Sequence, residues 1–422
     1  MNVTFLNIGD FGGGAAKAAY RLFSGMKNFH QQDGSVRFVT LEKKLPDEDV
    51  YPLAVFKEEK NRFEKIVSRI NRTVTSRFRN YHRNKYPDRK QAYIPDLYFS
   101  ELASALPNLE FDILHLHWVF GDFVNFKELQ KINKPIVWTI HDCLAFTGIC
   151  YYTGNCEKYQ SECGACPVLQ SSSDNDLSTS VFRTKMKRYA KLNLHIVSPS
   201  NWLAEKARES ALLGNKPVYV IPNGIDTEFF KPVEKKQARK ALGLDPGKRQ
   251  ILFGAIRIEG EKRKGYDELK KVLKILDGKI EDDVEFMILG ADYSGNDHYS
   301  FKTNYLGYIG DETKLVNAYS AADVMMFPSL EENLSNMIME ASACGTPTVA
   351  FHIGGNCDMI THRASGYLSA ENDPQDFADG VLWCLANNES NRLGKKARDR
   401  VINNFAIEKI TSRYWSLYQK IR

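Results

Sequence analysis

The chain has 422 residues, of which 43% are hydrophobic and 26% are charged, and its formal net charge is +5. This length exceeds one ordinary hydrophobic core and the composition excludes a disordered chain, so we expect two globular domains. The small excess of basic residues does not by itself indicate a nucleic-acid-binding protein. The first residues, MNVTFLNIGDFGGG, lack the features of a secretory signal, and no uncharged apolar run reaches about 18 residues. We therefore expect a cytoplasmic protein without a membrane-spanning helix.

Short apolar segments rich in β-branched residues alternate with segments of helical periodicity, which predicts parallel sheets covered by helices. A first series of strands is expected at 3–8, 36–41, 111–117, 135–141, 195–200 and 217–224, and a second at 250–256, 284–290, 303–310, 322–329 and 346–351. The predicted fold class is α/β, with two Rossmann-like domains that face each other across a cleft. The expected domains are 1–229 and 230–400, followed by a helical segment, 401–422, that could cross back to the N-terminal domain.

Residues 57–90 interrupt this alternation. They contain twelve Lys or Arg residues and four acidic residues, while apolar residues recur at helical spacing. This pattern predicts a basic amphipathic helix, which could bind an anionic membrane surface in the plane of the interface. The alternative is an ordinary helix whose apolar face packs on the sheet.

A second interruption, 142–176, is a predicted loop that contains five of the eight cysteines. Four of them follow the spacing C-x5-C-x6-C-x2-C, namely Cys150, Cys156, Cys163 and Cys166. Four thiolates are the ligand set of a closed structural zinc site, and the C-x2-C pair is typical of a zinc knuckle. Buried or paired thiols and a redox role remain open alternatives.

The segment PSLEENLSNMIMEASACGTPTVAF, residues 328–351, carries the strongest chemical signal. It reads as a strand end, a turn, a helix and another strand. Glu332 lies in the turn and Glu340 on the helix, so both can face one ligand. The turn Asn333-Leu334-Ser335 opens the helix, and its free N–H groups form an anion site suited to a diphosphate. An acid two turns deeper can accept hydrogen bonds from a ribose diol.

This segment closely resembles the family-4 retaining glycosyltransferases of the GT-B fold, of the kind that builds bacterial surface polysaccharides. Their mark is two acids separated by seven residues in a PS…E…E-A…CG-P-V setting, and the match runs from Pro328 to Ala350 with its spacing intact. A looser resemblance extends over nearly the whole chain. It includes FDILHLH, VWTIHD, SPSNWL, VIPNGID, the RKG of 263–265 and the YLGYIGD of 305–311.

The resemblance implies that Glu332 binds hydroxyl groups of the donor sugar and that Glu340 binds the ribose. It also implies a basic pair that neutralises the pyrophosphate of the leaving group. Lys264 is one member. Arg257 is favoured as the other, and the string GEKRKG offers Arg263 as the alternative. Positive side chains at this place lower the barrier because the leaving nucleoside diphosphate gains negative charge.

Further candidate residues lie in the N-terminal half. The glycine run after the first strand does not match a dinucleotide fingerprint. In look-alike enzymes this loop lines the cleft near the donor phosphate and the acceptor, and the resemblance implies that role for Gly13 and Gly14. His141 ends a predicted strand, and the family histidine touches the donor sugar. Asp142 could orient that ring or meet the acceptor hydroxyl. His115 and His117 share one face of the preceding strand, where a structural role is favoured.

The sequence thus predicts transfer of a sugar from a nucleoside-diphosphate sugar to a saccharide or polyprenyl-diphosphate-linked saccharide, without a catalytic metal or other cofactor and without nucleic acid as a partner. The expected place is the cytoplasm, including the inner face of the cytoplasmic membrane. Two alternatives are a sugar-nucleotide epimerase of the same fold and a basic, zinc-containing nucleic-acid-binding protein.

Overall fold

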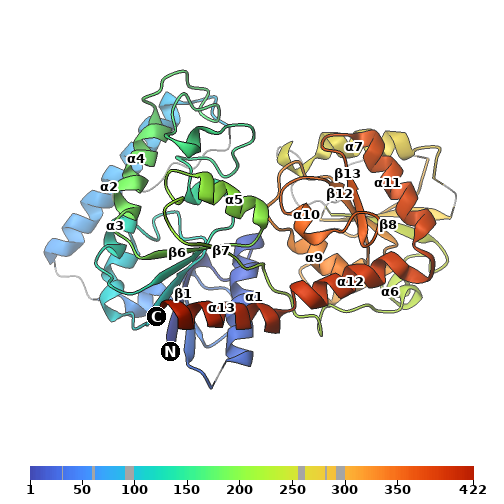
Figure 1. The fold of residues 1–422 in the computed structure, drawn as a ribbon, viewed down its shortest axis with the longest axis horizontal. Helices are drawn as coiled ribbons and strands as arrows, with labels where there is room; N and C mark the ends of the chain where they lie inside the picture. The colour runs from blue at the N-terminus through green and yellow to red at the C-terminus, as the bar shows by residue number, and fades with distance from the viewer. Residues whose placement is uncertain (31, 59–61, 91–98, 255–261, 281–282, 291–299) are drawn as a thin grey trace. The chain divides into compact units, whose positions relative to one another are not determined.

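The computed structural model describes residues 1–30, 32–58, 62–90, 99–254, 262–280, 283–290 and 300–422. These residues divide into two compact units, each visible in Figure 1. Unit 1 contains Met1–Ile221 and Thr411–Arg422, and unit 2 contains Pro222–Ile410. The change of unit at Pro222 comes earlier in the chain than the expected boundary at residue 230.

The described part of unit 1 is built on a seven-stranded parallel sheet. Its order is β3 (Val50–Pro52), β2 (Ser35–Glu42), β1 (Asn2–Gly9), β4 (Ile113–Leu116), β5 (Ile136–Thr139), β6 (Leu194–Ser198) and β7 (Val218–Val220). The central strands β4 and β5 are buried at every position, as expected for a sheet covered on both faces. The helices are α1 (Gly14–Phe29), α2 (Arg62–Lys85), α3 (Phe126–Leu129), α4 (Leu177–Tyr189), α5 (Asn201–Glu209) and most of α13 (Ile407–Ile421).

Unit 2 contains, within its described residues, a six-stranded parallel sheet. Its order is β10 (Thr303–Tyr305), β9 (Val284–Leu289), β8 (Arg249–Gly254), β11 (Val324–Phe327), β12 (Thr348–Phe351) and β13 (Gly366–Ser369). The helices are α6 (Lys235–Ala241), α7 (Tyr266–Leu276), α8 (Glu312–Ala321), α9 (Asn336–Ala343), α10 (Asn356–Met359), α11 (Pro374–Asn387) and α12 (Arg392–Asn404).

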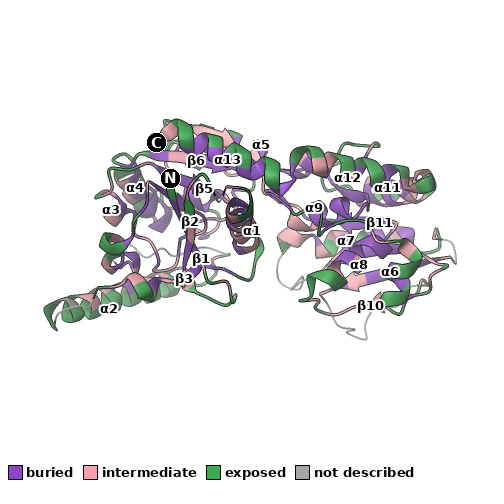
Figure 2. Cartoon of the chain, turned by 90° about the horizontal axis from the view of Figure 1, so that it is seen from below, coloured by how far each residue is buried: buried purple, intermediate pink, exposed green. Residues whose placement is uncertain are grey.

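Short 3-10 segments connect these elements at Leu53–Phe56, Leu102–Ser104, Leu106–Asn108, Cys143–Ala145, Lys158–Gln160, Lys262–Lys264 and Glu389–Asn391. In both units the buried residues follow the sheet strands and the helix faces that cover them (Figure 2). The predicted fold class, α/β with two parallel sheets, is confirmed.

The expected helix at 401–422 is interrupted. Helix α12 ends at Asn404 and α13 begins at Ile407, because the intervening backbone pairs with Ile225 instead. The N–H of Ile225 donates to the carbonyl of Phe405 at 2.9 Å, and the N–H of Ile407 donates to the carbonyl of Ile225 at 2.9 Å. A peptide group that bonds a neighbouring segment in this way cannot also complete the helical ladder.

The later part of α13 packs within unit 1. Its Tyr414 hydroxyl lies 2.9 Å from the Thr139 hydroxyl, at the end of β5, and Tyr418 contacts His115 of β4. The ring of Trp415 stacks on His30, with 4.9 Å between the ring centroids. The chain therefore returns to the N-terminal sheet at its last turns.

The basic helix is shorter than the expected segment 57–90. Helix α2 begins at Arg62 and ends at Lys85, just before Tyr86-Pro87. Proline lacks an N–H and disfavours helical conformation in the residue before it, which accounts for the stop. Among the described residues, no helix is both long enough and apolar enough to cross a bilayer.

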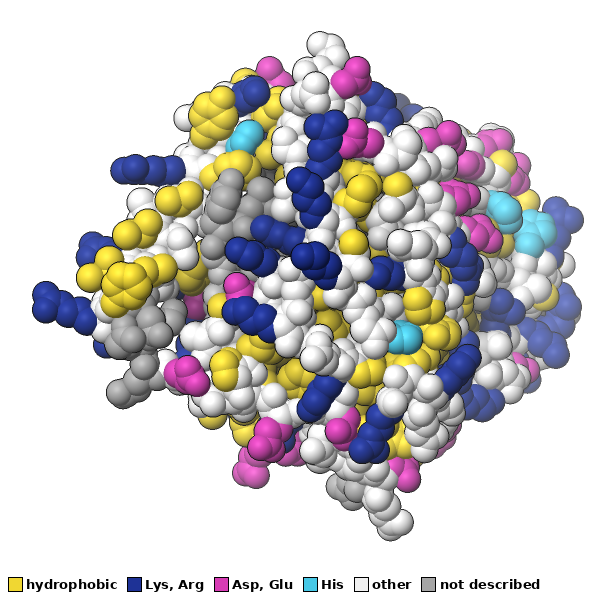
Figure 3. All heavy atoms as spheres, turned by 60° about the vertical axis from the view of Figure 1, so that its left-hand side comes forward, with side chains coloured by type: hydrophobic (Ala, Val, Ile, Leu, Met, Phe, Trp, Pro, Cys, Tyr) yellow, Lys and Arg dark blue, Asp and Glu magenta, His cyan; other side chains and the backbone are white. Residues whose placement is uncertain are grey.

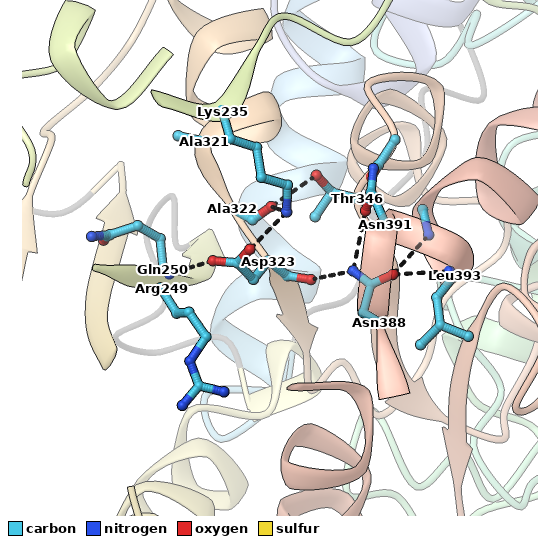
Figure 4. A network of polar contacts seen from close by, with 12 residues as sticks. Lys235, Arg249, Gln250, Ala321, Ala322, Asp323, Thr346, Asn388, Asn391 and Leu393 are labelled. Carbon is cyan, nitrogen blue, oxygen red and sulfur yellow. Dashed lines mark hydrogen bonds and ion pairs between the residues drawn. The ribbon is translucent and has the colours of Figure 1, made fainter. Parts of the chain in front are cut away.

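A partly buried acidic side chain, that of Asp323, joins α6, β8 and the start of β11 in unit 2 (Figure 4). Asp323 accepts from Lys235 Nζ at 2.7 Å and from the backbone N–H of Gln250 at 2.7 Å. The oxygen that accepts from Gln250, Oδ2, also lies 2.7 Å from Nη2 of Arg239, whose side chain is 8% exposed. The carboxylate thus holds a nearly buried guanidinium in place.

We expect Asp323→Ala to lower the free energy of unfolding by about 3 kcal/mol, because Arg239 would keep a buried charge without its carboxylate. The matched control is Asp283→Ala, since Asp283 and Arg249 form a partly exposed pair at 2.7 Å. Loss of that pair should cost less than about 1 kcal/mol. Urea unfolding of both variants measures the difference. Equal losses would show that the Asp323 network does not stabilise unit 2.

Candidate active site

The loop between β11 and α9 positions the two predicted acids differently. Ser335 is the N-cap of α9 and its side chain accepts a hydrogen bond from the N–H of Ile338 at 3.3 Å. Asn333 and Leu334 lie in the preceding turn, where both are buried. Glu332 is partly exposed in the same turn, whereas Glu340, further along α9, is 2% exposed. The N-terminus of α9 carries the positive end of the helix dipole, which favours an anion at this turn.

Glu332 lies beside the predicted basic string. Lys264 Nζ is 3.0 Å from Glu332 Oε2, and Arg263 Nη1 is 3.9 Å from the same oxygen. Arg263 Nη1 also donates to the carbonyl of Glu331 at 2.9 Å. The structure therefore brings Glu332, Lys264 and Arg263 together. Arg257, the other candidate for the basic pair, lies outside the described residues.

Glycine makes this proximity possible. Gly265 follows Lys264 with φ of +72°, a conformation that favours glycine, and a Cβ there would collide with the carbonyl of Pro328. The N–H of Leu330 also donates to the carbonyl of Arg263 at 2.8 Å. Backbone contacts therefore hold the turn that contains Arg263 and Lys264 against the turn that contains Glu332. The close approach explains why a glycine follows Arg263 and Lys264 in the sequence RKG.

Two further glycines, Gly354 and Gly355, contact the backbone of Glu332. The N–H of Gly355 donates to the carbonyl of Glu332 at 3.1 Å. A Cβ at Gly354, which has φ of +47°, would also collide with that carbonyl. Sequence reasoning missed this support, although the dipeptide Gly354-Gly355 directly after β12 is a signal that could have indicated it.

Glu340 is held by a residue that no sequence pattern singles out. The hydroxyl of Tyr319, on α8, donates to Glu340 Oε2 at 2.9 Å, and both residues are buried. The tyrosine therefore fixes one carboxylate oxygen of Glu340. Nothing in the pattern of α8 distinguishes Tyr319 from an ordinary core aromatic residue.

In unit 1 the glycine run forms the turn between β1 and α1. Gly12 and Gly13 have φ of +84° and +77°, and α1 begins at Gly14. A Cβ at Gly12 or Gly13 would meet no atom within 4 Å. These glycines are therefore required by backbone conformation rather than by close packing, and the space beside the turn is open.

His141 lies two residues beyond β5, where it is partly exposed and adjoins the buried His117 and His115. Its Nε2 is 3.1 Å from Nδ1 of His117, and His115 bonds Thr139 at 2.8 Å and Tyr418 at 2.7 Å. Burial lowers the pKa of His141 to about 4 and places the pKa values of His115 and His117 well below the usual range. These imidazoles are therefore neutral near pH 7.

Asp142 is engaged by its own surroundings. Oδ1 accepts from the N–H of Leu144 at 2.8 Å, as the cap of a 3-10 turn, and Oδ2 accepts from Nε1 of Trp118 at 3.1 Å. His117 bonds the ring of His141, a role that the alternation of the strand alone could not distinguish from core packing.

The four cysteines of the predicted zinc site line one small cavity in unit 1. Among the residues that the structure describes, no three Cys, His, Asp or Glu side chains already form a metal-ligating group. Of the other cysteines, Cys143, Cys344 and Cys384 are buried, and Cys357 is partly exposed.

We expect Lys264→Ala to weaken binding of a nucleoside diphosphate by about 1.5–3 kcal/mol, because a charge-assisted hydrogen bond is lost. Lys262→Ala is the matched control, since Lys262 lies in the same short turn but is exposed and forms no ion pair within the described chain. Calorimetric titration with UDP, GDP and ADP measures both variants. Equal affinities for wild type and Lys264→Ala would remove Lys264 from the site.

Both halves of the chain match known family models. Residues 12–229 match the family described as Glycosyltransferase Family 4, which is more than half of the chain. Residues 234–400 match the family described as Glycosyl transferases group 1. The two matches follow each other in the order of the two sheets.

A similar curated protein is the UDP-Gal:alpha-D-GlcNAc-diphosphoundecaprenol alpha-1,3-galactosyltransferase of Escherichia coli, 28% identical over 48% of this chain. The chain spans about half of that relative's length, 54%. Among solved structures, the sucrose-phosphate synthase of Thermosynechococcus elongatus has a TM-score of 0.62 at 17% identity, covering 99% of this chain and 98% of that one. HepE of Anabaena, solved with UDP, has a TM-score of 0.61 at 14% identity, covering 100% of both chains.

These solved structures share the architecture of two parallel-sheet domains, and the family match extends over more than half of the sequence. The chain therefore belongs to glycosyltransferase family 4 and has the GT-B fold.

Proposed function

We propose that the protein is a retaining glycosyltransferase that uses a nucleoside-diphosphate sugar. The observation that carries this proposal is the cluster of Lys264, Arg263 and Glu332 beside the N-terminus of α9. Positive side chains and the positive end of a helix dipole in one place are suited to a diphosphate. HepE, whose fold is similar, was solved with UDP, which supports a nucleotide-sugar donor.

The chemistry follows from charge. When the bond between the sugar and the diphosphate breaks, the leaving diphosphate gains negative charge, which Lys264 and Arg263 can stabilise. Lys264 would then exchange part of its contact with Glu332 for the phosphate, leaving that carboxylate to accept hydrogen bonds from sugar hydroxyls. Basic side chains can in this way supply the charge that a divalent cation supplies in other transferases, so we propose catalysis independent of a metal.

The remaining site residues take supporting roles. Glu340 accepts hydrogen bonds from the ribose hydroxyls, and Tyr319 of α8 positions the Glu340 carboxylate. The turn at Gly13 and Gly14 leaves open space for the donor or the acceptor. His141 contacts the donor sugar as a neutral imidazole whose orientation depends on His117. Asp142 lies on the acceptor side.

The acceptor that we propose is a saccharide or a polyprenyl-diphosphate-linked saccharide used for cell-surface polysaccharides. The support is the name of the galactosyltransferase relative, which describes an undecaprenol-diphosphate acceptor. Such an acceptor is anchored in a bilayer, so the enzyme must reach a membrane surface to use it.

We expect transfer to continue after exhaustive treatment with EDTA and the new glycosidic bond to have the same anomeric configuration as the donor. The assay combines the purified chain with UDP-, GDP- or ADP-sugars and with a polyprenyl-diphosphate-linked saccharide as acceptor, and NMR of the product gives the configuration. Glu332→Gln is the control for background hydrolysis. An inverted product would contradict retention, and turnover that is lost with EDTA and restored by magnesium or manganese would contradict metal independence.

Phe78 of helix α2 packs against a buried cluster that includes Tyr86 and Ile149, whereas the other large apolar side chains of the helix face solvent. The exposed fraction of these side chains runs from 38% for Val67 to 73% for Phe63. They recur every three or four residues and therefore form one stripe along the helix. In Figure 2 this helix is drawn largely in the colour of exposed residues. The exposed stripe consists of Phe63, Ile66, Val67, Ile70, Val74 and Tyr81.

The opposite face of α2 attaches the helix to unit 1 through ion pairs. Arg72 bonds Glu101, and Arg79 bonds both oxygens of Asp122 at 2.8 and 2.9 Å. Helical geometry places Arg72 and Arg79 about half a turn away from the stripe. The polar face is therefore the docked one, so the apolar stripe does not pack on the sheet.

We propose that the exposed stripe of α2 binds the anionic inner face of the cytoplasmic membrane. On the side of unit 1 that carries α2, Lys and Arg side chains project beside hydrophobic ones (Figure 3). An exposed apolar stripe flanked by basic residues fits the interface of an anionic bilayer, where each basic residue contributes about 1 kcal/mol. Its exposed basic residues include Arg62, Lys65, Arg69 and Arg77.

We expect the protein to sediment with vesicles that contain an anionic phospholipid and to be released by high salt. Changing Arg62, Lys65, Arg69 and Arg77 to Gln should reduce the bound fraction at least about tenfold at low salt, because roughly 1 kcal/mol is lost for each charge. Ile66→Ser with Ile70→Ser should reduce it at both salt concentrations, because these residues insert into the interface.

The matched control for charge changes Lys236, Lys240, Lys395 and Lys396, four exposed residues of unit 2, to Gln. This variant has the same net charge as the helix variant and should bind like the wild type. Equal binding of the two charge variants, or no binding of the wild type at low salt, would contradict docking through α2. Arg72 and Arg79 stay unchanged because they hold the helix on unit 1.

A further inference from the structure

The loop between β5 and α4 brings its cysteines to one place without using regular secondary structure. Residues 142–176 contain only two 3-10 turns, at Cys143–Ala145 and Lys158–Gln160. Yet Cys150, Cys156, Cys163 and Cys166, spread over 17 residues, all line the same cavity. The cavity has a volume of about 20 Å³, which is room for one occupant of the size of a water molecule or an ion.

One of the sulfur atoms is bonded to the backbone of the same loop. The N–H of Gly148 donates to Sγ of Cys163 at 3.3 Å. This bond joins the third cysteine of the spacing to the backbone two residues before the first, Cys150.

The buried side chain of Lys185 fastens the loop to α4. Its Nζ donates to the carbonyls of Leu144 and Thr147 at 2.6 and 2.8 Å. The backbone that leads to Cys150 is therefore held in place from the helix that follows the loop.

The last cysteine of the cluster, Cys166, is bonded to the residue that caps α4. The N–H of Cys166 donates to Asp176 at 2.9 Å, and Asp176 is also the N-cap of α4, accepting from the N–H of Ser178 at 2.8 Å. The last cysteine is thus fixed to the start of a helix, while the first follows the strand that leads to His141. Within the described chain the cysteines are free thiols, so no disulfide crosslinks this loop.

We propose that Cys150, Cys156, Cys163 and Cys166 bind a structural zinc ion that crosslinks the loop. The four sulfur atoms must turn inward to about 2.3 Å from the metal, a rotation of side chains that already line one cavity. Four protein ligands close the coordination shell, so the ion has no open position for substrate. Its role is to stabilise the folded loop. This site is independent of the proposed sugar transfer.

The test is elemental analysis of protein purified without a metal-affinity tag. We expect about one zinc per chain in the wild type, and none in the double variant Cys163→Ser with Cys166→Ser. The matched control is Cys143→Ala, a change in the same loop at a cysteine that does not line the cavity, and this variant should keep its zinc.

Two measurements on the wild type keep the test independent of whether the double variant folds. Replacement of zinc by cobalt(II) should produce the visible absorption of a tetrahedral thiolate site. Removal of the metal should make four additional thiols reactive toward a thiol reagent. Folded wild type that contains no zinc and takes up no cobalt would overturn the proposal. Disulfides within the loop, or a double variant that keeps its zinc, would also overturn it.

Discussion

The candidate site of unit 2 depends on one close approach between two backbone segments. Gly265 lies against the carbonyl of Pro328, where a side chain would not fit, and this contact brings Lys264 to 3.0 Å from Glu332. A longer separation would leave the positive group and the carboxylate as independent surface charges, which interact weakly in water. Because the contact is made by backbone, the pair is positioned before any ligand arrives. Preorganised charge is what makes electrostatic catalysis effective.

The parallel sheet supplies the frame for this contact. Strands β8 and β11 are paired neighbours, and in a parallel sheet their carboxyl ends lie at the same edge. The acidic turn follows β11, and the glycine pair that supports Glu332 follows β12, the next strand of the sheet. Side chains that are far apart in sequence therefore converge because consecutive strands end together. The burial of Glu340 has a different origin, since Tyr319 reaches it from α8.

Much of this architecture could be predicted from the sequence because periodicity and motif spacing are local properties. Apolar runs alternating with helical segments predicted both parallel sheets, and the spacing of Glu332 and Glu340 indicated the acidic turn and its helix. Contacts between distant elements left no comparable signal. Neither the bond from Tyr319 to Glu340 nor the bond from His117 to His141 has a local pattern, and the break at Phe405-Ala406 depends on pairing with Ile225.

In helix α2, ion pairs decide which face of an amphipathic helix contacts the rest of the domain. Apolar periodicity normally predicts the buried face, because burial of apolar surface is favourable by about 25 cal/mol per Å². Here Arg72 and Arg79 find carboxylates on unit 1, so the charged face is docked and the apolar face stays in solvent. Exposed Lys and Arg residues around the stripe keep it from forming an uninterrupted apolar patch. The hydrophobic free energy of this helix is thus left unused by the described fold, and it becomes available only when another apolar phase covers the stripe.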